Sequence, residues 1–210
     1  MKKVMVIAAV LGAFQLCGAT PPSRADTTSN SLLANGGFEM AGTQESLPQS
    51  WGLEMPKLAD GKIATVTRSK ERVHEGAWAL AVSDPVGLTG RNVGAEQKLE
   101  AAAFKSGVSV RVTVSALTLD SLSKDSFAYA SVAFYDATGK SLNNVVGAHV
   151  LNEFSKPSQW LTVSATGTVP TGFGSGCHAK LSLYLWEPKR TGSPNTVYFD
   201  DVSVAILPDH

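Results

Sequence analysis

The chain has 210 residues, with 18 lysines and arginines against 18 aspartates and glutamates, so its formal net charge at pH 7 is zero. This balance supplies no basic surface for a nucleic-acid backbone or an anionic membrane, and we expect no nucleic acid as partner. Charged residues make up 17% of the chain and hydrophobic residues 43%, a composition that excludes an intrinsically disordered protein.

The first 25 residues have the three-part pattern of a secretory signal peptide. Lys2 and Lys3 precede an apolar run at 4–14, and small residues lead to a cleavage position after Ala25. The apolar run is too short to span a bilayer, so we expect export to the exterior, the cell surface or the periplasm, without stable membrane insertion. Lipidation of Cys17 is the alternative.

Cleavage would change both the charge and the cysteine count. Three of the 18 basic residues and none of the acidic ones would be lost, which leaves a slightly acidic mature chain. Only Cys177 would remain, and it alternates in phase with Leu181. We therefore expect a buried, unpaired cysteine here and not a catalytic thiol. Residues 26–30 would form a short disordered start.

Beyond residue 30 the sequence has the features of β-strands. Hydrophobic and polar residues alternate at 108–115 and 181–186, which is the period of a strand with one buried face. Shorter stretches of this kind lie near residues 31–38, 50–55, 63–68, 77–82, 95–99, 127–136, 160–169 and 196–207. Turn signals separate them, and the only helical candidate is a weak one at 95–105. We therefore predict one all-β domain at residues 31–210, either a sandwich or a barrel.

One acidic side chain falls in an apolar strand phase near the end of the domain. Asp200 shares its phase with the apolar residues of 198–206, so the alternation directs its carboxylate toward the core. A buried carboxylate needs a cation, or a proton and a hydrogen-bond partner. Glu39 stands beside the glycine pair at 36–37, and such an oxygen set is what calcium prefers. The alternatives are an arginine or lysine partner, or an inward Asp201.

Six motifs occur in the order seen in one known family. They are Leu-Leu-x-Asn-Gly-Gly-Phe-Glu at 32–39, Leu-Pro-x-x-Trp at 47–51, Val-His-Glu-Gly-Ala-Trp-Ala-Leu at 73–80, Phe-Tyr-Asp-x-x-Gly-Lys at 134–140, Trp-x-x-Val-Ser at 160–164 and Val-Tyr-Phe-Asp-Asp-Val at 197–202. Together they resemble the carbohydrate-binding modules of families 4, 9 and 22 over nearly all of residues 31–207.

The resemblance implies a galactose-binding-like jelly roll, a β-sandwich of two antiparallel sheets, with a glycan as its partner. It also implies a structural calcium ion that ties the first strand to the last. The implied ligands are the Gly37 carbonyl, the carboxylates of Glu39 and Asp200, and the loop at 72–75, from which we take Glu75.

The phase opposite to the core phase carries aromatic and hydrogen-bonding side chains on three predicted strands. We expect these strands to share one sheet, whose outer face would stack the apolar side of a sugar ring and bind its hydroxyls. The predicted sugar-binding residues are Arg111, Tyr129, Tyr135, His178, Tyr184 and Trp186, with the last two as the main platform. Ordinary cross-strand pairs on a half-exposed sheet are the alternative.

Catalytic motifs are absent from the sequence. The four histidines show no zinc-protease spacing, no Gly-x-Ser-x-Gly elbow occurs, and neighbouring strand residues such as Asp200 and Asp201 point to opposite faces. We therefore expect a non-catalytic, monomeric glycan-binding protein. Two alternatives stay open: a polysaccharide lyase with Tyr135 or Tyr184 as base, and a cell-surface module that binds protein.

Overall fold

The structure is a computed structural model that describes residues 31–54, 64–84, 91–187 and 195–208. The predicted signal peptide and the predicted disordered residues 26–30 lie outside these ranges. The described residues form ten strands and one short 3-10 helix: β1 (Gly52–Glu54), β2 (Thr65–Ser69), β3 (Ala79–Asp84), β4 (Arg91–Leu99), η2 (Ala101–Ala103), β5 (Ser109–Thr118), β6 (Phe127–Tyr135), β7 (Ser141–Asn152), β8 (Leu161–Thr168), β9 (His178–Glu187) and β10 (Asn195–Ile206).

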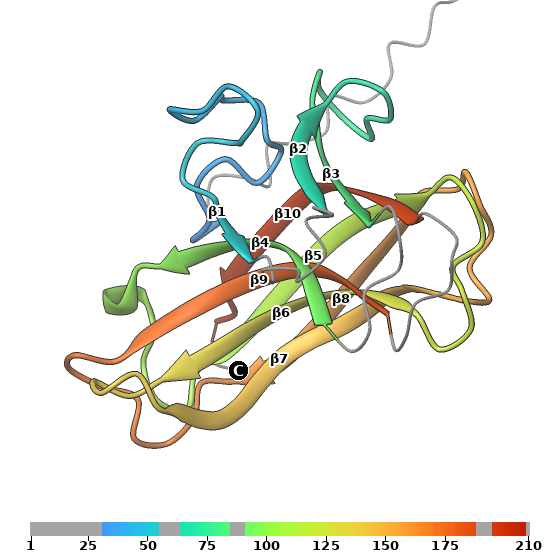
Figure 1. Cartoon of the computed structure of the whole chain (residues 1–210). Helices are drawn as coiled ribbons and strands as arrows, with labels where there is room; N and C mark the ends of the chain where they lie inside the picture. Colours follow the sequence, from blue (N-terminus) through green and yellow to red (C-terminus); the bar gives the residue numbers. More distant parts are fainter. Residues whose placement is uncertain (1–30, 55–63, 85–90, 188–194, 209–210) are drawn as a thin grey trace, which may run out of the picture.

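Two five-stranded antiparallel sheets pack face to face (Figure 1). The first sheet has the strand order β1-β4-β9-β6-β7, and the second has the order β2-β3-β10-β5-β8. Strands that follow one another in sequence often lie in different sheets, as β5 and β6 do. This architecture confirms the predicted all-β jelly-roll sandwich.

The core lies between the inner faces of the two sheets. On β5 the inward phase is Val110, Val112 and Val114, each at most 2% exposed, and the inward phase of β9 is made of leucines. Each fully buried side chain of this size stabilises the fold by about 1.5–3 kcal/mol. The alternation that predicted these two strands therefore also identified their buried faces correctly.

Three phenylalanines, one from β6 and two from outside the strands, fill one region of the core. The ring centroid of Phe104 lies 5.7 Å from that of Phe134 and 6.0 Å from that of Phe173, all in edge-to-face arrangements. Cys177 is also part of this core, at 8% exposure, and is a free cysteine. The sequence-based expectation of a buried, unpaired thiol is confirmed.

Two strand predictions are wrong. Residues 31–38 form bends and turns. Asn35 and Phe38 have positive φ angles of 55° and 58°, which an extended strand does not allow. The longest missed strand is β7, whose sequence at 141–152 contains an asparagine pair and a glycine that interrupt the alternation. This omission matters, because β7 borders the candidate site.

Helical structure in the described ranges is limited to η2, so the weak helical candidate at 95–105 consists of the end of β4 followed by this short 3-10 helix. No helix within these ranges is long and apolar enough to cross a membrane.

Candidate functional site

Five of the six predicted sugar-binding residues lie on the outer face of the first sheet. On the neighbouring strands β6 and β9, Trp186 pairs with Phe127, Tyr184 with Tyr129, and His178 with Tyr135. Directly opposite residues of an antiparallel pair share one face of the sheet. The structure therefore brings Tyr129, Tyr135, His178, Tyr184 and Trp186 together, as expected from their strand phases.

Arg111 does not belong to this face, and its prediction is wrong. The residue lies on β5, where it is exposed and pairs with Ala205 of β10 and Thr166 of β8 in the second sheet. The prediction assumed that β5, β6 and β9 share one sheet. The chain crosses to the other layer between β5 and β6, so the outer phase of β5 faces away from the aromatic residues.

One end of the outer face is a continuous group of aromatic rings. Phe127 stacks on Trp186 with ring centroids 4.9 Å apart, and the rings of Tyr129 and Tyr184 lie 5.4 Å apart. His149 of β7 connects the two pairs, with its ring 4.3 Å from Phe127 and 4.9 Å from Tyr129. We call these five residues the aromatic platform.

The sequence alone did not identify two members of the platform. Phe127, the first residue of β6, is not among the predicted sugar-binding residues, although it is in phase with Tyr129. His149 lies on β7, the strand that the sequence did not predict. Had a strand been predicted at 141–152, its pairing with β6 would have placed His149 directly opposite Tyr129.

Small side chains form the centre of the outer face. Ser131 of β6 pairs with Gly147 of β7 on one side and with Ser182 of β9 on the other, and Ser182 pairs with Glu96 of β4. Gly147 has no room for a side chain, since an added Cβ would lie 2.5 Å from the Ala130 carbonyl oxygen. This row of small residues separates the aromatic platform from a polar pocket.

The polar pocket has a volume of about 480 Å³. Its lining residues come from β1, β4, β9, the end of β6 and two turns: Ser50, Gly52, Glu96, Lys98, Tyr135, Gly139, His178 and Lys180. Inside it, the rings of Tyr135 and His178 stack with centroids 4.9 Å apart and an angle of 10° between their planes.

An ion pair crosses the floor of the polar pocket. Lys180 Nζ donates a hydrogen bond to Glu96 Oε2 over 2.6 Å. Burial lowers the pKa of Lys180, but the hydrogen bond to Glu96 and the charges of Glu96 and Glu54 outweigh it, so the pKa is raised overall. Lys180 is therefore a permanent cation that offers its remaining N–H groups to a ligand.

Tyr184 and Glu54 lie in one row across the sheet, because Gly94 of β4 pairs with both of them. Burial raises the pKa of Tyr184 to about 12, with contributions from Tyr129 and from the charge of Glu54. Glu54 Oε2 is buried and has no hydrogen-bond partner among the described residues. Tyr184 is thus a neutral hydrogen-bond donor at ordinary pH.

Asp200 is fully buried, as predicted, but it faces away from the core. It pairs with Ser115 of β5, whose neighbours Val114 and Ala116 face inward, so Asp200 lies on the outer side of the second sheet. A β-bulge between Asp200 and Ser203 shifts the phase of β10. Its carboxylate is buried by the loop that precedes β3, and not by the core.

The Asp200 carboxylate accepts three backbone hydrogen bonds. Oδ2 receives the N–H groups of His74 at 2.8 Å and Glu75 at 3.2 Å, and Oδ1 receives the N–H of Asp201 at 2.8 Å. Burial raises the pKa of Asp200 to about 6, although the hydrogen bonds from His74 and Asp201 counteract it.

Glu39 anchors the other end of the same loop. Its Oε1 accepts hydrogen bonds from the backbone N–H groups of Ala77 at 2.8 Å and Trp78 at 3.1 Å. The loop approaches so closely at Gly76, where φ is 75°, that an added Cβ would lie 2.1 Å from Oε1. We call the loop at 74–78 with Asp200 and Glu39 the clasp.

This arrangement does not fit the predicted calcium site. Calcium requires six to eight oxygen ligands, whereas both oxygens of Asp200 and Oε1 of Glu39 already accept backbone N–H groups. Gly36 directly precedes the predicted ligand Gly37, and its carbonyl accepts the N–H of Val202.

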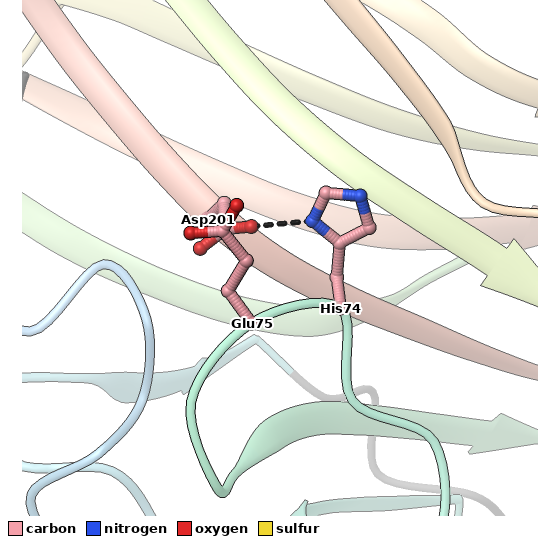
Figure 2. Close-up of side chains that lie close together, drawn as sticks. All are labelled: His74, Glu75 and Asp201. Atoms are coloured by element: carbon pink, nitrogen blue, oxygen red, sulfur yellow. Dashed lines mark hydrogen bonds and ion pairs between the residues drawn. The ribbon is translucent and has the colours of Figure 1, made fainter. Parts of the chain in front are cut away.

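The third predicted carboxylate, Glu75, extends from the loop toward Asp201 (Figure 2). The ligand atoms of His74, Glu75 and Asp201 all lie within 4.8 Å of one another, and His74 Nδ1 is 2.5 Å from Asp201 Oδ2. His74 and Asp201 are not among the metal ligands predicted from the sequence.

The fold is shared with solved structures of very different sequence. The chain is similar to the CBM22-1 xylan-binding domain of Xyn10C from Paenibacillus barcinonensis, with a TM-score of 0.55, 16% identity, and coverage of 86% of this chain and 97% of that domain. It is also similar to the Stig cyclase Fisc from Fischerella sp. TAU, with a TM-score of 0.57, 18% identity, and coverage of 86% and 98%.

A further similar structure is the enzymatically active domain of tailspike protein 4 from bacteriophage CBA120. The TM-score is 0.58 at 14% identity, and the match covers 84% of this chain but only 21% of the tailspike chain. No protein-family model and no curated protein matches the sequence. The chain therefore has the β-sandwich fold of carbohydrate-binding modules, as the motif resemblance implied, and enzymes also use this fold.

Proposed function

We propose that the chain is exported by its first 25 residues and binds a carbohydrate, without cleaving it, on the outer face of the first sheet. The observation that carries this proposal is the combination, on one face, of the aromatic platform and the polar pocket. Likeness to xylan-binding modules supports the choice of a glycan over a protein partner.

The two regions match the two surfaces of a sugar ring. The C–H face of a pyranose is apolar and packs against flat aromatic rings such as Trp186 and Tyr184, while its hydroxyls require hydrogen-bond partners. Lys180 and the neutral Tyr184 supply hydrogen-bond donors along the same face. The row of small residues lies between the two regions and joins them on one sheet.

The raised pKa of Tyr184 supports binding over lyase chemistry. A lyase base must lose its proton near the operating pH, and a phenol with a pKa of about 12 keeps it. A lyase also needs a group that neutralises the uronate, for which His178 and Arg111 are the candidates, and Arg111 lies in the other sheet. These two observations remove two of the groups on which a lyase mechanism would depend.

Affinity electrophoresis and calorimetry against xylan, mixed-linkage glucan, mannan and pectin test this proposal. We expect at least one polysaccharide to bind, and Trp186→Ala to weaken its binding about tenfold, which corresponds to about 1.4 kcal/mol. Arg111→Ala is the matched control, because Arg111 is exposed on the other sheet, and it should bind like wild type.

Three results would contradict the proposal. If no polysaccharide binds, or if Arg111→Ala weakens binding as much as Trp186→Ala, the outer face of the first sheet is not a carbohydrate site. If the protein releases new reducing ends or unsaturated products from the bound polysaccharide, it is an enzyme and not a binding module.

A further inference from the structure

The loop of the clasp and the neighbouring bulge of β10 bring one imidazole and two carboxylates close together. His74 and Glu75 lie on the loop before β3, and Asp201 lies in the bulge of β10 (Figure 2). Their ligand atoms lie within 4.8 Å of one another, although Asp201 is more than 120 positions away along the chain. The side chains of His74 and Asp201 are 27% and 32% exposed, so an ion from solvent can reach this point.

One buried side chain fixes the backbone of all three residues. The N–H groups of His74, Glu75 and Asp201 are the three donors that the fully buried Asp200 carboxylate accepts. The carboxylate sets the starting position of each side chain and prevents the loop from moving away from β10. A binding site whose backbone is held in this way is organised before its ligand arrives.

The imidazole of His74 is also oriented from outside the cluster. The ring of Trp160 packs edge-on against it, with ring centroids 5.1 Å apart. This contact leaves Nδ1 directed toward Asp201, at 2.5 Å from Oδ2. Nδ1 therefore already has Asp201 as its partner, and a bound ion would take the place of the proton between these two atoms.

The donor set selects the class of ion. Calcium and magnesium prefer oxygen ligands, whereas imidazole nitrogen with carboxylate oxygen suits zinc and the neighbouring divalent transition metals. Three protein ligands leave coordination positions for water, in agreement with the partial exposure of the cluster.

We propose that His74, Glu75 and Asp201 bind a divalent transition-metal ion of the zinc class, which links the loop before β3 to the last strand. The site lies on the second sheet, so it acts on the stability of the clasp and is separate from the proposed carbohydrate face. It replaces the all-oxygen calcium site that the family resemblance implies.

Metal titration of the full-length mature protein, produced without a polyhistidine tag and dialysed against EDTA, tests this inference. We expect Zn²⁺ to bind with a stoichiometry of one and to raise the melting temperature, and Ca²⁺ at the same concentration to leave it unchanged. His74→Gln and Asp201→Asn should each weaken Zn²⁺ binding at least tenfold. His149→Gln, which removes an exposed histidine of the aromatic platform, is the matched control and should bind like wild type.

X-ray absorption of the zinc-loaded wild-type protein provides a measurement that does not depend on the variants folding. One imidazole among oxygen ligands is expected. The proposal is overturned if the wild-type protein does not bind Zn²⁺, if His149→Gln and not His74→Gln removes the binding, or if the spectrum lacks an imidazole. Stabilisation by Ca²⁺ alone, lost in Glu39→Gln and retained in His74→Gln, would overturn it in favour of an oxygen site.

Discussion

Tyr129 of β6 lies directly opposite Tyr184 of β9, with the two ring centroids 5.4 Å apart and an angle of 40° between the ring planes. Both side chains are half-buried, and each therefore keeps one part of its ring accessible. The pair forms the border of the aromatic platform next to the row of small residues. Under the proposed function, a sugar bound to the platform would contact these two rings.

Removing either tyrosine is expected to weaken carbohydrate binding. Tyr129→Ala and Tyr184→Ala should each reduce the affinity about tenfold, and the double variant should lose less than the product of both effects, because the rings contact each other. Calorimetry with the tightest polysaccharide measures the affinities. Tyr198→Phe is the control, since Tyr198 lies on the second sheet. Affinities unchanged in both single variants would contradict a role for the pair.

The close approach of strands at Gly147 should make this position intolerant of any side chain. Gly147→Ala places a Cβ 2.5 Å from the Ala130 carbonyl oxygen and 2.8 Å from the Ser131 Cβ, so the sheet must distort, at a cost of about 1–3 kcal/mol. Gly174→Ala is the matched control, because no atom lies within 4 Å of its added Cβ. Urea unfolding measures both variants. Equal stability of the two would show that β6 and β7 do not pack this closely.

Two tyrosines are expected to titrate late. Burial raises the pKa of Tyr184 to about 12, and burial together with the 2.6 Å hydrogen bond to Glu71 raises the pKa of Tyr198. Between pH 10 and 12 the folded protein therefore holds protons that the unfolded chain has lost, so the free energy of unfolding should fall as pH rises. Ultraviolet titration of wild type, Tyr184→Phe and Tyr198→Phe measures the ionisation of the tyrosines, and urea unfolding at pH 10 and above measures the free energy of unfolding. A late step that neither variant reduces would contradict the assignment.

Loss of the Asp200 carboxylate should destabilise the whole fold. Asp200→Ala leaves three backbone N–H groups of the clasp without an acceptor, and the expected loss is about 3 kcal/mol or more. Asp200→Asn retains one acceptor oxygen and should lose less. Asp136→Ala is the control, since this aspartate also accepts backbone N–H groups but lies in an exposed turn. Unfolding curves that coincide for Asp200→Ala and Asp136→Ala would contradict the role of the clasp.

Much of the candidate site was predictable from the sequence, because alternation within one strand is a local property. The phases of β6 and β9 placed Tyr129, Tyr135 and Tyr184 on the outer face, and the structure confirms them. Arg111 was misplaced because the sheet to which a strand belongs depends on pairing with distant segments, on which periodicity carries no information. His149 was missed for a different reason, since β7 lacks the regular alternation that marks a strand.

The environment of Asp200 also depends on segments that are distant in the sequence, which strand alternation alone does not identify. Its burial was predicted correctly from the apolar phase of 198–206, but the bulge in β10 reverses the direction in which the side chain points. The loop at 74–78 that covers it has no strand periodicity, so its hydrogen bonds to Asp200 could not be anticipated. The sequence-based hypothesis gave Asp200 a cation as partner, and the structure shows three backbone N–H groups at this carboxylate.

The clasp also has a consequence for the order in which the chain folds. The hydrogen bond from His74 to Asp200 spans 126 positions, and β10 is the middle strand of the second sheet, between β3 and β5. During synthesis the earlier strands of this sheet therefore emerge without the partner that joins them, and loop closure over such a distance is slow. The protein is expected to reach its native state only after its last strand has been synthesised, in one late step that assembles the sheet and closes the loop together.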